Sequence, residues 1–120
     1  MPDNPLPEDA TPIVWIADTW EGNTSSLFEL DDQTAGVITY IGGWWFDFSY
    51  GGVQTLTVNE DGVWAAATPE EFLWPYAIRD HVWIPLDVQA TLVWSAESTD
   101  PSDNGAIIIC GYQYVPQYTE

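Results

Sequence analysis

Residues Val53 to Ala67 read VQTLTVNEDGVWAAA and carry the plainest structural signal in the chain. Two short runs of β-forming residues, 53–58 and 62–67, flank Asn59-Glu60-Asp61-Gly62. Asp-Gly is among the pairs that tight hairpin turns prefer, because its residues tolerate a positive φ. The segment therefore predicts an antiparallel β-hairpin with Asp61-Gly62 at its turn.

Further β-rich runs lie on both sides of this hairpin, separated by Gly, Asn, Asp and Pro. They are 13–17, 26–30, 36–41, 44–50, 77–84, 88–96 and 106–115. Strands repeating every ~8–12 residues are typical of a β-sandwich or barrel. We therefore expect an all-β fold, an antiparallel β-sandwich, with at most one short helix near 69–74, where Thr68 and Pro69 form a helix start.

Alternation along individual runs predicts which side chains are buried, because successive residues of a strand point to opposite faces. The shared face of 88–96 consists of Val88, Ala90, Leu92 and Trp94. The shared face of 44–50 consists of Trp44, Phe46, Phe48 and Tyr50, with Trp45 on the other side. The run 106–115 starts apolar on both faces, which indicates a central strand or one covered by another chain. Gly111 within it indicates a bulge or a close backbone approach.

The length and the proline distribution predict one domain with an extended N-terminal arm. A chain of 120 residues is the size of a single domain. Residues 1–12 contain four prolines, which cannot donate to a sheet or lie inside a helix. We expect an arm over 1–12, either frayed or gripping a neighbouring subunit through residues such as Pro5 and Pro7, and a β-sandwich over 13–120.

The charge balance predicts a salt-rich environment and excludes two classes of partner. Nineteen Asp and Glu residues oppose one Arg and no Lys, which gives a net charge of −18. Molar salt shortens the Debye length to about 3 Å and screens the resulting self-repulsion. A single arginine cannot form the basic patch that nucleic acid or an anionic membrane requires, so neither is expected as a partner. The N-terminus also lacks the features of a signal peptide, which predicts synthesis in the cytoplasm.

Few residues have chemistry that could support catalysis. There is one histidine, His81, next to Asp80, and one cysteine, Cys110, in an apolar run. We interpret His81 as structural and Cys110 as a small buried hydrophobe, although either could belong to a nucleophilic site. Together with Arg79 they are the distinctive groups that a small enzyme would have to use. We expect no enzyme activity and no cofactor.

A metal site is a weak possibility in one loop. Its candidate ligands are Asp100, Asp103 and Asn104, which carry oxygen atoms of the kind that Ca²⁺ or Mg²⁺ prefers. Their spacing matches no ordered calcium-binding loop. We therefore expect no specific metal.

Aromatic residues are the strongest candidates for binding. The chain has eight Trp and six Tyr, more than a core of this size needs. Trp20, Trp45 and Tyr118 lie in or beside polar stretches, where a ring is often an interface anchor or a sugar platform. Core packing is the competing interpretation for each of them.

The stretch from Ile78 to Tyr114, under a third of the chain, resembles a pattern found near the end of jelly-roll domains in structural proteins of tailed viruses. The matching stretches are Ile84-Pro85-Leu86-Asp87, Val88 to Ala96, Ser98-Thr99-Asp100, Asn104-Gly105 and Tyr112-Gln113-Tyr114. The resemblance implies a jelly-roll-like sandwich and a head decoration, turret or fibre-type protein, usually trimeric and without active-site residues. With the acidic composition, it implies a virus of a halophilic archaeon.

These observations lead to a main functional hypothesis and an alternative. The main hypothesis is a non-enzymatic capsid decoration protein on the head surface, which binds further copies of itself, as a homotrimer, and the major capsid protein or other virion proteins. The alternative is a carbohydrate- or protein-binding β-sandwich module that uses exposed Trp and Tyr.

Overall fold

The computed structural model describes residues 8–19, 24–45, 53–67, 76–97 and 105–116. These residues form eight β-strands and no helix. The strands are β1 (Thr11–Thr19), β2 (Thr24–Glu29), β3 (Ala35–Trp45), β4 (Val53–Val58), β5 (Asp61–Ala67), β6 (Tyr76–Leu86), β7 (Thr91–Glu97) and β8 (Gly105–Tyr114). The expected helix near 69–74 lies outside the described residues.

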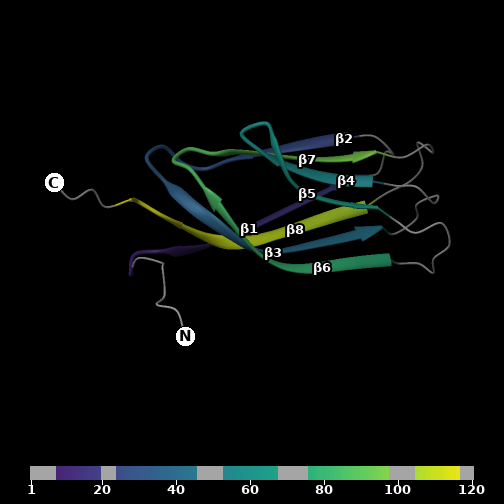
Figure 1. Cartoon of the computed structure of the whole chain (residues 1–120), viewed down its shortest axis with the longest axis horizontal. Helices are drawn as coiled ribbons and strands as arrows, with labels where there is room; N and C mark the ends of the chain where they lie inside the picture. Colours follow the sequence, from purple (N-terminus) through teal and green to yellow (C-terminus); the bar gives the residue numbers. More distant parts are fainter. Residues whose placement is uncertain (1–7, 20–23, 46–52, 68–75, 98–104, 117–120) are drawn as a thin grey trace.

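The strands form two four-stranded sheets that pack face to face (Figure 1). One sheet has the order β1-β8-β3-β6 and the other β2-β7-β4-β5. Every neighbouring pair is antiparallel. The expected antiparallel β-sandwich is confirmed.

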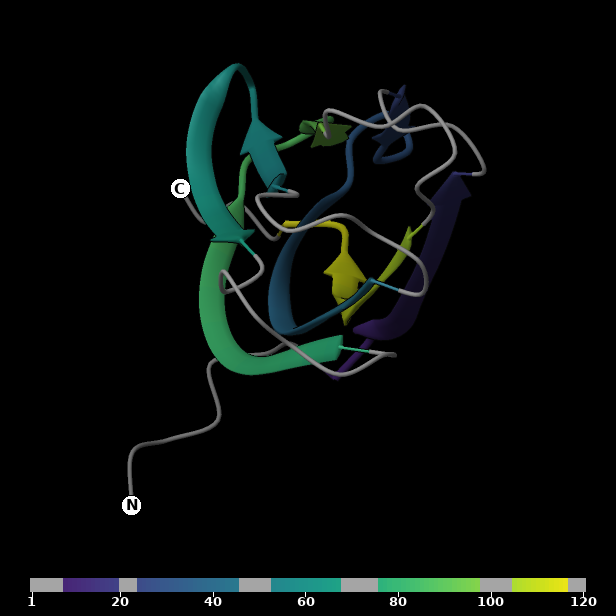
Figure 2. The ribbon, with the colours of Figure 1, turned by 90° about the vertical axis from the view of Figure 1, so that its right-hand side faces the viewer.

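The pairing follows one rule along the whole chain. β4 pairs with β5, β3 with β6, β2 with β7 and β1 with β8, so the chain is one long hairpin wound around the core. Eight strands wound in this way into two sheets form a jelly roll. Seen along the long axis, β5 and β6 adjoin on one side and β1 lies on the opposite side (Figure 2).

The core lies between the two sheets and is almost entirely apolar. Its fully buried side chains are Trp45, Trp94, Ile38, Ile41, Leu56, Leu92, Ile107 and the polar Gln54. In β7 the inward set contains Leu92 and Trp94, as the alternation predicted. Val88, also expected inward, lies exposed in the turn before β7, because that strand begins only at Thr91.

The inward face of the Trp44-Trp45 segment is the reverse of the prediction. Trp45 is 0% exposed and packs in the core, whereas Trp44 lies on the outer face. The sequence pattern predicts two separate strands, 36–41 and 44–50, but β3 continues through Gly42-Gly43 to Trp45. Alternation from the buried Ile41 therefore passes through Gly43 to Trp45.

Gly111 marks a close approach of two central strands, as predicted. A β-carbon added there would lie 2.0 Å from the Val37 carbonyl oxygen. The β3–β8 register shifts between Ile38 and Tyr40, which leaves Thr39 as an extra residue opposite Cys110 and Gly111. The bulge in β3 and the missing side chain of Gly111 occur at the same point. β8 can therefore approach its neighbour β3 this closely only with glycine in this position.

The 53–67 hairpin forms, but its turn lies two residues earlier than predicted. Asn59 and Glu60 form the two-residue turn with φ values of 50° and 74°, and Asp61 and Gly62 already belong to β5. Two consecutive positive φ angles match the type I′ turn of short hairpins. The register between β4 and β5 shifts between Leu56 and Thr57, so a β-bulge lies next to Gly62.

β1 begins at Thr11, two residues before the predicted start, and includes Pro12. Pro85 lies in β6. β1 and β6 are the two edge strands of their sheet, where a missing N–H removes no ladder hydrogen bond on the open side.

Two side-chain hydrogen-bond systems link the layers. Buried Gln54 donates to the Trp44 carbonyl oxygen at 2.9 Å and accepts from the Trp94 indole at 3.0 Å. The indole of Trp64 in β5 donates to the Asp80 carboxylate in β6 at 2.7 Å. The second bond connects the adjoining edges of the two sheets.

Candidate binding surface

The outer side of the β1-β8-β3-β6 sheet forms a surface that we call the acid-poor face. The register aligns three rows of outward positions across the four strands. The rows are Val14, Cys110, Tyr40 and His81; Ile16, Ile108, Gly42 and Arg79; and Asp18, Ala106, Trp44 and Ala77. Their inward neighbours, such as Ile13, Ile107 and Ile109, are buried in the core.

Large apolar side chains on this face are open to solvent. Val14 is 61% exposed and Ile16 is 64% exposed. Trp83, further along β6, and Tyr112 in β8 are also exposed. Trp44 and Ile108 close over Gly42, where an added β-carbon would lie 2.9 Å and 3.1 Å from their atoms, so the centre of the face has no gap. Val14 and Ile16 lie side by side on one face of β1, and exposed apolar side chains gathered on one face make that face a candidate interaction site.

The acid-poor face carries few acids, although the chain as a whole is strongly acidic. Asp18 is the one acid in the three rows, against nineteen acids in the sequence. Arg79 and His81, the sole arginine and the sole histidine, both lie here. The His81 ring packs against Tyr40, with 5.4 Å between ring centroids. A chain of net charge −18 thus keeps one sheet face nearly free of carboxylates.

The structure corrects one predicted binding residue. Trp45 is fully buried, so it cannot anchor a partner; it belongs to the core for the reason given above. The remaining predicted positions lie outside the described residues: Trp20, Tyr118, Pro5 and Pro7 at the proposed interfaces, and Asp100, Asp103 and Asn104 at the proposed cation loop.

The binding residues that sequence reasoning missed are Val14 and Ile16. Run 13–17 is apolar on both faces, as is the start of 106–115. Because β1 pairs with β8, the two surplus apolar sets lie side by side. Two strands that are apolar on both faces were the available signal.

The groups that a nucleophilic site would need do not converge. His81 points outward, whereas the adjacent Asp80 bonds to Trp64 on the other side of the sheet. Cys110 lies in the same row as His81, but β3 runs between their strands. The interpretation of Cys110 as a small buried hydrophobe is wrong, because its side chain is only partly buried and lies on the outer face. In the part of the chain that is described, no three His, Cys, Asp or Glu side chains group as metal ligands would.

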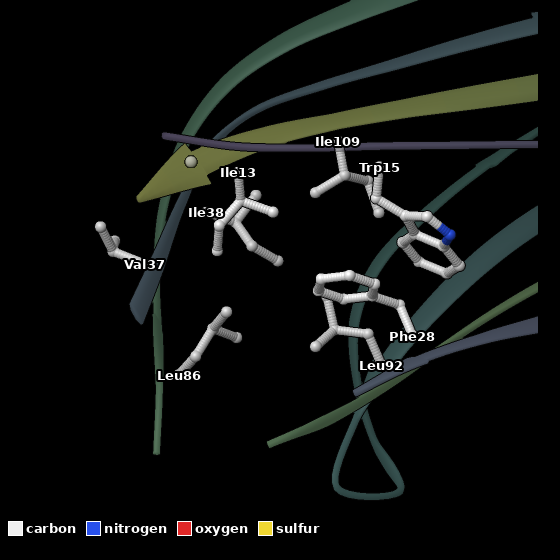
Figure 3. A pocket seen from close by; sticks show the side chains of 9 residues that line it. Ile13, Trp15, Phe28, Val37, Ile38, Leu86, Leu92 and Ile109 are labelled. Carbon is white, nitrogen blue, oxygen red and sulfur yellow. The ribbon is translucent and has the colours of Figure 1, made fainter. Parts of the chain in front are cut away.

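A cavity of about 10 Å³ lies inside the sandwich near Gly111 (Figure 3). Its lining is apolar, with Ile13, Ile38 and Ile109 on one side and Phe28 and Leu92 on the other. Trp15 stacks on Phe28 at 5.3 Å and closes it. A cavity this small with no polar lining holds no ordered water or ligand, so it is a packing gap.

A groove of about 480 Å³ lies on the outer side of the other sheet. Its lining residues are Leu27, Thr57, Asn59, Glu60, Thr91 and Val93. Hydroxyl, amide and carboxylate groups there could bond to a polar ligand. None of these six residues is aromatic, so the groove lacks the ring platform expected of a sugar-binding site.

Comparison with known proteins adds information on the fold. No family model and no curated protein matches the sequence. Among solved structures, the crystal structure of dimeric latent PorU from Porphyromonas gingivalis is similar, with a TM-score of 0.55 and 13% identity. The match covers 92% of this chain and 13% of the PorU chain. At this identity the similarity concerns the fold alone.

The described residues include no helix long and apolar enough to span a membrane.

Proposed function

We propose that this chain is a non-catalytic structural protein that works by contact, as a decoration or accessory protein on the surface of a virus head. One observation carries the proposal: the acid-poor face exposes Val14 and Ile16 on a sheet with one acid in three rows. Burying such a surface against a partner costs little desolvation free energy, because few charges have to leave water.

The jelly-roll strand order is compatible with this proposal. Coat and accessory proteins of viruses are among the users of that fold, and lectin domains are others. Fold alone therefore does not select the function. The support comes from the combination of exposed Val14 and Ile16 with the only two basic side chains on the acid-poor face, while the loops expose acids that keep the chain soluble in brine.

The partners proposed are further copies of this chain and virion coat proteins. Particles banded on a density gradient from the source of this gene should contain the chain, detectable by mass spectrometry. Particles carrying the Ile16→Asp variant should lose it, because that change places a charge among the exposed apolar side chains of the face. Recovery of the wild-type chain only in particle-free fractions would contradict the virion proposal.

A carbohydrate-binding module is the second candidate, and the groove beside the β4–β5 hairpin is the observation that favours it. Thr57, Asn59 and Thr91 supply hydrogen-bonding groups of the kind that sugar hydroxyls use. Binding to a glycan array that is lost in Asn59→Ala and kept in Ile16→Asp would favour this candidate over the first.

A further inference from the structure

We propose that the acid-poor face binds the acid-poor face of a second copy of this chain, across a two-fold axis that runs parallel to the strands. This inference rests on the proposed contact function and names the partner of the same surface. It concerns a pair of chains, whereas the viral resemblance implies a trimer.

The first argument is electrostatic and limits how two copies can meet. Each copy has a net charge of −18, so most relative orientations bring carboxylates together. The loops carry Asp31, Asp32, Glu60 and Asp87, all exposed. The acid-poor face holds one acid, Asp18, together with Arg79 and His81, whereas the outer side of the other sheet exposes Glu29 and has no cation.

The second argument is the placement of the two charged residues within the face. Asp18 lies on β1 and Arg79 on β6, which are opposite edges of the same sheet. A two-fold axis parallel to the strands places β1 of one copy against β6 of the other and β8 against β3. Asp18 then faces the row next to Arg79 of the second copy, an offset of about 7 Å along the strand, which an arginine side chain can span. The same contact occurs twice, as two-fold symmetry requires.

The third argument is the chemistry of the centre. Ile16 and Ile108 occupy the middle row, and Trp44 with Ile108 fills the space over Gly42. Two such sheets can pack in the aligned arrangement of β-sandwiches, at about 30° and about 10 Å apart. In this arrangement Ile108 of each copy lies over Gly42 and Trp44 of the other, which forms an apolar centre. Ile16 and Val14, on the edge strand, lie against Arg79 and His81 of the second copy and are covered by them.

The dependence on salt follows from these terms. At about 0.1 M salt the Debye length is about 10 Å, and repulsion between the two acidic chains opposes pairing. At about 3 M salt that repulsion is screened, while apolar contact remains. Pairing should therefore strengthen with salt, although the Asp18–Arg79 attraction weakens.

The test is the mass of the purified full-length chain by light scattering and sedimentation, from about 0.1 M to about 3 M NaCl. Ile108→Asp, at the centre of the face, is compared with Val93→Asp, which places the same charge on the outer side of the other sheet. Both side chains are half-buried on a central strand of their sheet, so the variants are matched in chemistry and in position. We expect a wild-type dimer at high salt, a dissociation constant raised at least ~100-fold by Ile108→Asp, and little change in Val93→Asp.

A second pair of variants tests the symmetry axis. Asp18→Arg and Arg79→Asp should each weaken the dimer, and the double variant should restore it, because the exchanged charges still meet across the axis. These measurements belong at the lowest salt at which the wild type remains a dimer. Failure of the double variant to restore pairing would overturn the proposed axis.

The outcomes separate this inference from the proposed function. A wild-type monomer at every salt concentration, a trimer, or equal effects of Ile108→Asp and Val93→Asp would overturn pairing through this face. If the isolated chain is a monomer and Ile16→Asp still removes it from particles, the contact function stands and the second-copy inference fails. If the isolated chain is a monomer and Ile16→Asp also leaves it on the particles, both fail.

Discussion

Replacing Gly111 with alanine tests the packing of β8 against β3 at the centre of the fold. The added β-carbon would lie 2.0 Å from the Val37 carbonyl oxygen and 3.0 Å from the Ile38 α-carbon. Both contacts are with backbone, so no side chain can turn away to relieve them. The strands would have to move apart by about 1 Å, in a ladder whose normal spacing is about 4.8 Å.

The expected cost combines two effects. Overpacking of a core costs about 1–3 kcal/mol, and each weakened ladder hydrogen bond adds about 1 kcal/mol. We therefore expect Gly111→Ala to lower the free energy of unfolding by about 3 kcal/mol or more. With a urea m-value of about 2 kcal/mol/M, the midpoint should fall by about 1.5 M.

Gly62→Ala is the matched control, because an added β-carbon there meets nothing within 4 Å. Both variants reduce the entropy of the unfolded chain equally, so that contribution cancels in the comparison. Gly62→Ala should change stability by no more than about 0.5 kcal/mol. The assay is urea unfolding at high salt, followed by tryptophan fluorescence. Equal urea midpoints for the two variants would refute the close approach of β8 to β3 at Gly111.

Three further predictions concern the core and the charge. Gln54→Leu should lower the free energy of unfolding by about 2–4 kcal/mol, because it leaves the Trp94 indole N–H and a backbone carbonyl without their partner. Adding Trp94→Phe should recover part of that loss, measured by urea unfolding. Strictly additive effects of the two changes would contradict the hydrogen-bond network. Leu92→Ala, at 1% exposure, should cost about 2–5 kcal/mol, whereas Leu27→Ala, at 65% exposure, should cost under about 1 kcal/mol by the same assay. The unfolding midpoint of the wild type should rise between about 0.1 M and about 3 M NaCl, since screening relieves repulsion within the folded chain; a midpoint that falls with salt would contradict the salt adaptation inferred from composition.

Local features of the sequence predicted most of the strands. The 53–67 hairpin, the inward alternation of Ala90, Leu92 and Trp94, and the close approach at Gly111 are each encoded within about ten residues. Turn chemistry and two-residue periodicity act over that range, so these predictions needed no knowledge of the partner strands. The sequence pattern predicts the turn at Asp61-Gly62, but in the structure both residues lie in β5, where a bulge next to Gly62 accommodates one extra residue. The turn therefore falls on Asn59-Glu60.

The candidate binding surface depends on contacts that no local pattern contains. Trp45 points inward because β3 continues through Gly42-Gly43, a continuity set by pairing with β6 and β8. Val14, Cys110, Tyr40 and His81 form one row although they come from four separate parts of the chain. Composition and periodicity show that a strand has two apolar faces; the pairing of distant strands determines which of those faces is left open to solvent, because the core can cover only one side of each sheet.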